Sequence, residues 1–129
     1  MGAIGSASTK QEFHLLQLWV PLAQRGHAGA QYILGRMYLE GKGAPRDDQK
    51  AHMWFLKAAE QDNPEAQFYL GLMYTKGRGV DRNDIKAAHW LRFAAERGNV
   101  RGQCYLSRMY ARGIGVPRSY IYAYMWAML

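Results

Sequence analysis

Apolar residues recur at helical spacing from about position 30 of this 129-residue chain. Side chains three, four and seven positions apart share one face of a helix, so the first apolar stripe predicts a helix over residues 28–39. The residues of this stripe are Ala30, Leu34, Met37 and Tyr38. Gly41 follows the stripe and suits the left-handed residue that ends many helices. The pattern therefore predicts an amphipathic helix with a turn directly after it.

A second apolar stripe begins at residue 51 and stands at positions i, i+3, i+7 and i+8. It predicts a second helix with one buried face, formed by Ala51, Trp54, Ala58 and Ala59. Asp47 precedes this helix and can cap it, because its side-chain oxygen can accept a hydrogen bond from an unpaired backbone N–H group. The two helices and the turn between them form one unit.

This unit returns twice at a constant offset. The segments ILGRMYLEGKGA, YLGLMYTKGRGV and YLSRMYARGIGV begin at residues 33, 69 and 105, each 36 positions after the one before. Residues 27–62 and 63–98 are identical at 16 of 36 positions, where background composition would give about two or three. The sequence predicts an all-α solenoid in which residues 10–129 form a single repeat domain. Its three helix-turn-helix repeats of 36 residues are 27–62, 63–98 and 99–129, the last with a short second helix.

Nine positions are identical in all three copies. They include a methionine set and a tryptophan set, and we predict that both form ladders in the core of the array. They are Met37, Met73 and Met109, and Trp54, Trp90 and Trp126.

The N-terminal end is predicted to hold a half-unit. A backward shift by 36 residues aligns residues 10–26 with the second helix of a repeat and places Leu15 and Leu18 in its buried slots. This segment would cap the array, although Pro21 should disturb its helix. Residues 1–9 are expected to be a flexible N-terminus.

The chain ends in YIYAYMWAML, residues 120–129, which is apolar and aromatic. Solenoids normally end in a polar capping face. Two explanations stay open: the chain is a fragment of a longer array, or it self-associates through this C-terminal apolar end.

Each unit contains a Gly-x-Gly sequence, which raises the possibility of a phosphate-binding loop. A Walker-type loop needs Ser or Thr after its lysine, whereas Lys42 is followed by Gly43. A dinucleotide-binding loop needs a preceding strand, and this sequence follows a predicted helix. The glycines are therefore interpreted as turns between helices.

Few residues of the sequence could catalyse a reaction or bind a metal. Cys104 is the single cysteine, and the four histidines have no partner at metal-ligand spacing. We therefore expect no catalytic residues, no metal site, no cofactor and no enzymatic activity. The sequence has no membrane-spanning apolar run and no secretory signal, so a cytoplasmic location is expected.

The stretch AQFYLGLMYTKGRGV, followed by KAAHWLRFAAERG, resembles the Sel-1-like repeat, a 36-residue relative of the tetratricopeptide repeat. The resemblance covers about residues 26–129 and implies a right-handed α/α superhelix. It also implies a non-enzymatic adaptor that holds a protein or peptide on a concave surface lined by the first helix of each unit. Ser107 departs from the glycine of the pattern, and we expect it to open the third unit slightly.

The formal net charge is +7, and no acidic residue follows Glu96. Arg101, Tyr105, Arg108 and Arg112 stand at i, i+4, i+7 and i+11, on one face of a helix. Arginine binds carboxylates through two parallel hydrogen bonds, so this face is a candidate site for an acidic or C-terminal peptide segment. Equivalent positions of the earlier units would extend it, namely Tyr32, Arg36, Phe68 and Leu72. The alternative reading is a solvated basic face.

Two other functions remain as alternatives: a nucleic-acid-binding helical repeat, and a structural fragment of a longer repeat protein. Nucleic acid is disfavoured as a partner because no basic residue repeats on the exposed face, where Arg36 becomes Leu72. One arginine does repeat, as Arg46, Arg82 and Arg118, but beside the turn, where a backbone or capping contact explains it.

Overall fold

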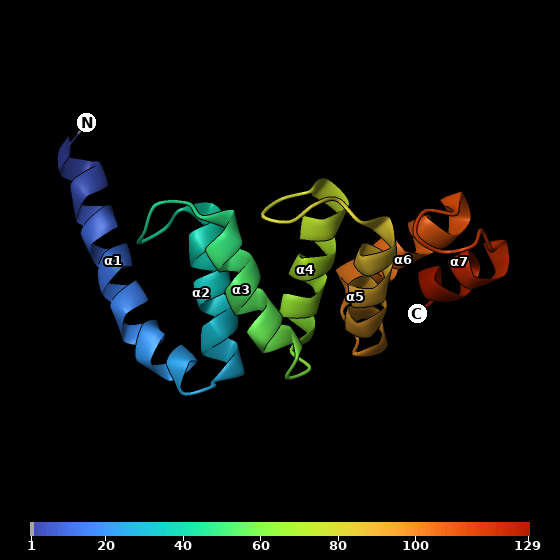
Figure 1. The fold of residues 1–129 in the computed structure, drawn as a ribbon, viewed down its shortest axis with the longest axis horizontal. Helices are drawn as coiled ribbons and strands as arrows, with labels where there is room; N and C mark the ends of the chain where they lie inside the picture. Colours follow the sequence, from blue (N-terminus) through green and yellow to red (C-terminus); the bar gives the residue numbers. More distant parts are fainter. Residues whose placement is uncertain (1) are drawn as a thin grey trace.

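The computed structural model describes the chain from residue 2 to residue 129, with side chains described from residue 10 onward. It contains seven helices and no strand within residues 2–129. The helices are α1 (Gly2–Gln24), α2 (Ala28–Glu40), α3 (Asp48–Ala59), α4 (Pro64–Lys76), α5 (Asp84–Glu96), α6 (Val100–Arg112) and α7 (Tyr120–Ala127). They lie side by side in chain order, and each packs against the next (Figure 1). The predicted all-α solenoid is confirmed.

The second helix of each repeat begins where the sequence predicts. Asp47, Asn83 and Ser119 cap the second helices, and each side chain accepts a hydrogen bond from the backbone N–H group three residues later. Asn63 and Asn99 cap α4 and α6 in the same way. Sequence reasoning missed the cap of α2, which is His27: its Nδ1 atom lies 3.1 Å from the backbone nitrogen of Ala30.

The two glycines of each turn have different structural roles. Gly77 ends α4 in the left-handed conformation, with φ of 67°. Gly79 packs against the preceding unit, and a Cβ atom there would lie only 2.5 Å from the backbone oxygen of Asp48. Gly43 has the same relation to Glu12, and Gly115 to Asp84. The second glycine therefore sets how closely each turn approaches the unit before it.

The methionine ladder is buried as predicted, but the tryptophan ladder is buried only in its first member. Trp54 is 8% exposed, whereas Trp90 and Trp126 are half-buried at the edge of the core. The fully buried residues are the next ones along the helix, Phe55 and Leu91. The prediction of a tryptophan core is wrong for the second and third repeats: Trp90 and Trp126 contact the core only at its edge, and in α5 the fully buried position belongs to Leu91.

Helix pairs approach closely at a glycine in the first two repeats. A Cβ atom on Gly35 would lie 2.6 Å from the Phe55 ring, and one on Gly71 2.6 Å from Leu91 Cγ. The third repeat has Ser107 at this position, with Ala127 in the slot of Phe55 and Leu91. The Ser107 hydroxyl donates to the Ala123 carbonyl at 2.6 Å. Since the opposing residue is small, the reason for expecting a wider third unit does not hold.

A repeated side-chain hydrogen bond joins successive units. The Nε2 atom of Gln31 donates to the Ala23 carbonyl, and Gln67 donates to Ala59 in the same way. Gln103 and Ala95 form the third such pair, and all three bonds are 3.1 Å long. Each first helix is thereby tied to the end of the second helix before it, which explains why this glutamine is identical in every copy.

The N-terminal half-unit differs from its prediction. Helix α1 continues through Pro21, and Leu16 and Ala23 face the core. Leu15 and Leu18, which the alignment places in buried slots, are 49% and 63% exposed. Pro21 removes one backbone hydrogen-bond donor and crowds the preceding turn. We attribute to it the shift of the buried position upstream from Leu15 to Leu16, whereas Ala23, which follows Pro21, is buried as expected. The expectation of a flexible N-terminus falls on residues 1–9, whose side chains lie outside the described residues.

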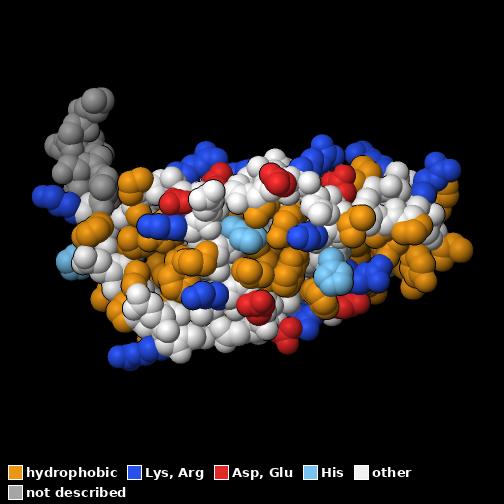
Figure 2. All heavy atoms as spheres, viewed as in Figure 1, with side chains coloured by type: hydrophobic (Ala, Val, Ile, Leu, Met, Phe, Trp, Pro, Cys, Tyr) orange, Lys and Arg blue, Asp and Glu red, His pale blue; other side chains and the backbone are white. Residues whose placement is uncertain are grey.

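Hydrophobic side chains gather at the end of the molecule formed by α7 (Figure 2). Its exposed large side chains are Tyr120, Ile121, Tyr122, Tyr124, Met125, Met128 and Leu129. Self-association through this surface stays a prediction. Within the described part of the chain, no helix combines the length and hydropathy that crossing a bilayer requires.

The half-buried His52 links folding to pH. Burial lowers the pKa of His52, and the positive charge of Lys86 lowers it further. Its Nε2 atom lies 3.4 Å from the Tyr74 hydroxyl, and the two rings meet edge to face. A folded-state pKa below the unfolded value of about 6.5 favours the neutral ring on folding. This contribution to stability is complete above that pH and is lost as the pH falls through the folded-state pKa.

We therefore expect the free energy of unfolding to fall as the pH drops below about 6.5, and His52→Gln to reduce that slope. Urea titrations at a series of pH values measure it. A variant with the slope of the original chain would show that another group is responsible.

Candidate functional site

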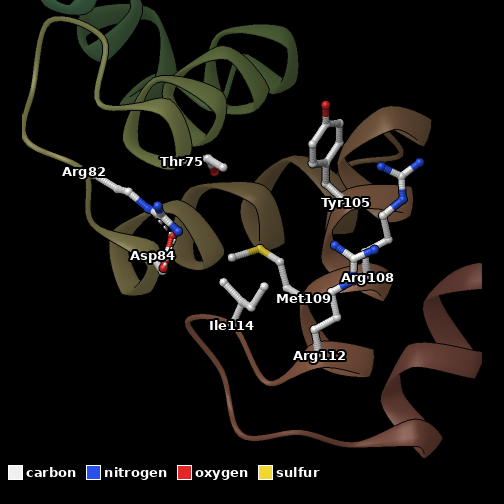
Figure 3. A pocket seen from close by; sticks show the side chains of 8 residues that line it. All are labelled: Thr75, Arg82, Asp84, Tyr105, Arg108, Met109, Arg112 and Ile114. Atoms are coloured by element: carbon white, nitrogen blue, oxygen red, sulfur yellow. Dashed lines mark hydrogen bonds and ion pairs between the residues drawn. The ribbon is translucent and has the colours of Figure 1, made fainter.

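A pocket of about 160 Å³ lies between the second and third repeats. We call it the second-junction pocket; it is lined by Thr75, Arg82, Asp84, Tyr105, Arg108, Met109, Arg112 and Ile114. In Figure 3, the Arg82–Asp84 pair stands on one side and the side chains of α6 stand on the other. The pocket thus combines three helices and two turns from different repeats.

Three of the predicted site residues meet in this pocket. Tyr105, Arg108 and Arg112 line it from one face of α6, and the guanidinium carbon of Arg108 lies 5.4 Å from the centre of the Tyr105 ring. Arg101 shares that helix but does not line the pocket. Its guanidinium carbon lies 4.4 Å from the centre of the Phe68 ring, a cation–π distance.

Phe68 is not available to a ligand. The sequence places it among the exposed variable positions, but it is 1% exposed. Its ring packs against α5 at Ala87 and Leu91 and meets the Tyr105 ring at 5.8 Å. The alanines of α5 leave room for a large ring here, which sequence periodicity alone could not reveal. Phe68 therefore packs against the Tyr105 ring and would not contact a bound ligand.

In the first repeat, Arg36 is already paired. Its Nη2 and Nε atoms donate to Oε2 of Glu40 at 2.8 and 3.2 Å, and this hydrogen bond raises the pKa of Arg36. The Tyr32 ring lies 6.0 Å from that of Tyr69, and burial raises the pKa of Tyr32. The prediction of Arg36 as an open carboxylate ligand is therefore corrected: its charge is balanced within its own helix.

Leu72 belongs to a second, equivalent pocket between the first and second repeats. This first-junction pocket measures about 140 Å³ and is lined by Leu39, Tyr69, Leu72, Met73, Lys76 and Arg78. Each of these residues stands 36 positions before a lining residue of the second-junction pocket. The pocket is thus a property of the repeat, and its chemistry varies between copies.

The two pockets differ in charge. Arg108 replaces Leu72, and Arg112 replaces Lys76. Neither Arg108 nor Arg112 forms an ion pair with any acidic residue in the described part of the chain. The absence of acids after Glu96 explains this imbalance.

Sequence reasoning missed the opposite wall of the second-junction pocket. The sequence favours a backbone or capping contact for Arg82, but its Nη2 atom pairs with Oδ2 of Asp84 at 3.4 Å. Arg46 and Asp48 form the same pair at 3.2 Å one repeat earlier. The repeated arginine followed two positions later by an aspartate was the signal that could have identified this pair.

The chemistry of the second-junction pocket is that of a polar binding site. It offers cationic groups from Arg108 and Arg112, one carboxylate from Asp84, and the hydroxyls of Thr75 and Tyr105 above an apolar base. Within residues 10–129, no three His, Cys, Asp or Glu side chains lie together as a metal site would require.

Comparison with known proteins identifies the repeat. A family described as Sel1 repeat matches residues 28–63, 64–99 and 100–127. Two solved structures are similar over most of the chain. One is a protective antigen of uropathogenic Escherichia coli strains that displays an SLR fold, with 38% identity and a TM-score of 0.83. The other is a Sel1 repeat protein from Oxalobacter formigenes, with 31% identity and a TM-score of 0.87.

These alignments cover 85% and 97% of this chain. They cover 24% of the Escherichia coli chain and 50% of the Oxalobacter chain, so this sequence spans no more than half of either. No curated protein matches the chain. Because the three matched segments cover most of the sequence and coincide with the helical hairpins, the chain belongs to the Sel1 repeat family.

Proposed function

We propose that this chain is a non-enzymatic interaction module that binds an acidic or C-terminal peptide segment of another protein. Sel1 repeats are generally protein–protein interaction modules and typically non-enzymatic scaffolds. The segment would lie across α4 and α6, on the face formed by the first helices, with its carboxylates at the second-junction pocket.

The observation that carries this proposal is the unbalanced charge of Arg108 and Arg112. Five other arginines of the array are held in ion pairs: Arg36, Arg46, Arg78, Arg82 and Arg97. Two unpaired guanidinium groups beside a partly buried tyrosine favour a planar anion, because guanidinium can donate two parallel hydrogen bonds to a carboxylate.

Tyr105 contributes an apolar surface to the same site. It is held from beneath by the buried Phe68 and lies under the guanidinium group of Arg108. A rigid aromatic side chain at a binding site offers contact area at a low entropic cost. The site would therefore accept a carboxylate together with the aliphatic part of the residue that carries it.

The test compares a fluorescein-labelled peptide rich in Asp and Glu with its Asn and Gln counterpart by fluorescence anisotropy. We expect the acidic peptide to bind, and the double variant Arg108→Glu and Arg112→Glu to weaken binding at least about tenfold. Lys10→Glu with Arg25→Glu makes the same change in net charge at exposed positions on α1 and its end. This control should retain binding.

Equal loss in both double variants would show attraction by net charge alone and would contradict a defined site. A single-stranded RNA that binds more tightly than the acidic peptide, with steep salt dependence, would overturn the proposal in favour of nucleic-acid binding.

A further inference from the structure

The middle residue of the Gly-x-Gly turn reaches back to the preceding repeat. In the second repeat this residue is Arg78, which pairs with Asp48 through two hydrogen bonds of 3.0 and 3.3 Å. Its Nη2 atom also donates to the Leu39 carbonyl at 3.3 Å, near the end of α2. Carbonyls in the last turn of a helix have no partner within the helix and attract cations. Arg78 therefore occupies a cation slot built by the repeat before it.

Asp48 is arranged to bind two guanidinium groups at once. Arg46 donates to it from the preceding loop, with both hydrogen bonds at 3.2 Å, while Arg78 approaches from the next repeat. The hydrogen bonds from Arg46 and Arg78 lower the pKa of Asp48. The carboxylate is thus held charged by two cations.

The third repeat lacks the second cation. The residue 36 positions after Arg78 is Ile114, which cannot pair with the equivalent carboxylate, Asp84. Among the described side chains, Asp84 keeps only the equivalent of Arg46, namely Arg82, at the longer distances of 3.4 and 3.5 Å. Asp84 and Arg82 line the second-junction pocket, whereas Asp48 and Arg46 do not line the first-junction pocket. With isoleucine in place of arginine, Asp84 lacks the contact that Arg78 makes with Asp48, and both Asp84 and Ile114 line the pocket (Figure 3).

We propose that a lysine or arginine side chain of the bound peptide fills this slot. Its cation pairs with Asp84 and donates to the Thr75 carbonyl, as Arg78 does with Asp48 and the Leu39 carbonyl. The inference rests on the proposed function, because the same peptide places a carboxylate at Arg108 and Arg112. The preferred ligand is then a peptide with both signs of charge, a basic residue close to an acidic residue or to a C-terminal carboxylate.

The charged side chains that line the pocket favour a ligand with both positive and negative groups over a purely acidic ligand. A ligand with carboxylates alone would leave Asp84 near its own negative charges, and like charges repel in a partly enclosed site. A cation at Asp84 removes that repulsion and reproduces a pair already present one repeat earlier.

The experiment uses two probe peptides that share their acidic residues and free C-terminal carboxylate. One carries a lysine beside them and the other a methionine in its place. Isothermal titration calorimetry with the full chain should show about tenfold tighter binding of the lysine peptide, the size of one charge-assisted hydrogen-bonded pair. Asp84→Asn should abolish this preference, because the lysine loses its partner while the methionine peptide binds at least as tightly as to the original chain, now free of the repulsion by Asp84. Asp62→Asn, which removes an exposed carboxylate paired with Arg97 outside the pocket, should leave the preference intact.

Ile114→Arg gives a second, independent variant. It restores the residue type of the first junction, so the introduced guanidinium should occupy the slot and abolish the lysine preference without loss of the acidic contacts. Circular dichroism confirms that each variant is folded. A lysine preference that survives both Asp84→Asn and Ile114→Arg would overturn the inference and leave the proposed function standing. If neither peptide binds the original chain, both fail.

Discussion

Phe55→Ala is expected to lower the free energy of unfolding by about 3–5 kcal/mol. The Phe55 ring is completely buried at the junction of α2, α3 and α4. It lies against Gly35, stacks on the Tyr69 ring at 5.2 Å and approaches the Tyr32 ring at 6.1 Å. Removing it leaves a cavity that three helices would have to close, and close packing at two successive units makes such a collapse difficult.

The informative comparison is Trp90→Ala. The tryptophan is the larger side chain and is identical in all three repeats, yet it is only half-buried. We expect its replacement to cost less than that of Phe55, because the lost contacts are partly replaced by water. Urea unfolding followed by circular dichroism measures both variants. A cost for Trp90→Ala equal to or above that of Phe55→Ala would contradict the burial described for the two residues.

Gly79→Ala is expected to cost about 2–5 kcal/mol, the second largest effect. The residue has φ of 72°, where an L-residue other than glycine is disfavoured by about 1–2 kcal/mol. The added Cβ atom would also lie 2.5 Å from the backbone oxygen of Asp48 and would force the two repeats apart. Overpacking of this kind costs about 1–3 kcal/mol more.

Gly98→Ala separates these two causes. Gly98 has a similar positive φ of 89°, but no atom lies within 4 Å of a Cβ atom placed there. It should show the conformational cost alone, so its melting temperature should fall less than that of Gly79→Ala. Equal melting temperatures would mean that the contact between turn and preceding unit does not limit the approach of the repeats.

The same turn connects stability with the proposed binding site. Gly77 and Gly79 hold Arg78 over Asp48 at the first junction, and the equivalent glycines hold Ile114 near Asp84 at the second. The same turn conformation therefore supports an ion pair between repeats where its middle residue is Arg78, and leaves an open slot at Asp84 where that residue is Ile114. Variation of that side chain between repeats is a simple way for a solenoid to bind at one junction and not at another.

Much of the fold could be predicted because it follows local rules. Helical periodicity, the caps at Asp47, Asn83 and Ser119, and the left-handed glycines each depend on residues within a few positions of one another. The 36-residue offset then extended one correct hairpin to three. Three of the eight predicted site residues, Tyr105, Arg108 and Arg112, line the second-junction pocket because they share one helical face.

The sequence by itself determined the helices, their order and the excess of arginine after Glu96. The tertiary structure alone decided which of two adjacent apolar residues enters the core, Trp90 or Leu91, since that depends on the angle at which the neighbouring helix crosses. It also decided which charges are balanced: Arg78 meets Asp48 across 30 residues, whereas Ile114 stands in the equivalent place near Asp84. The periodicity of the sequence shows which residues share one face of a helix. Whether a residue on that face is buried or ion-paired depends on the side chains that the next repeat packs against it.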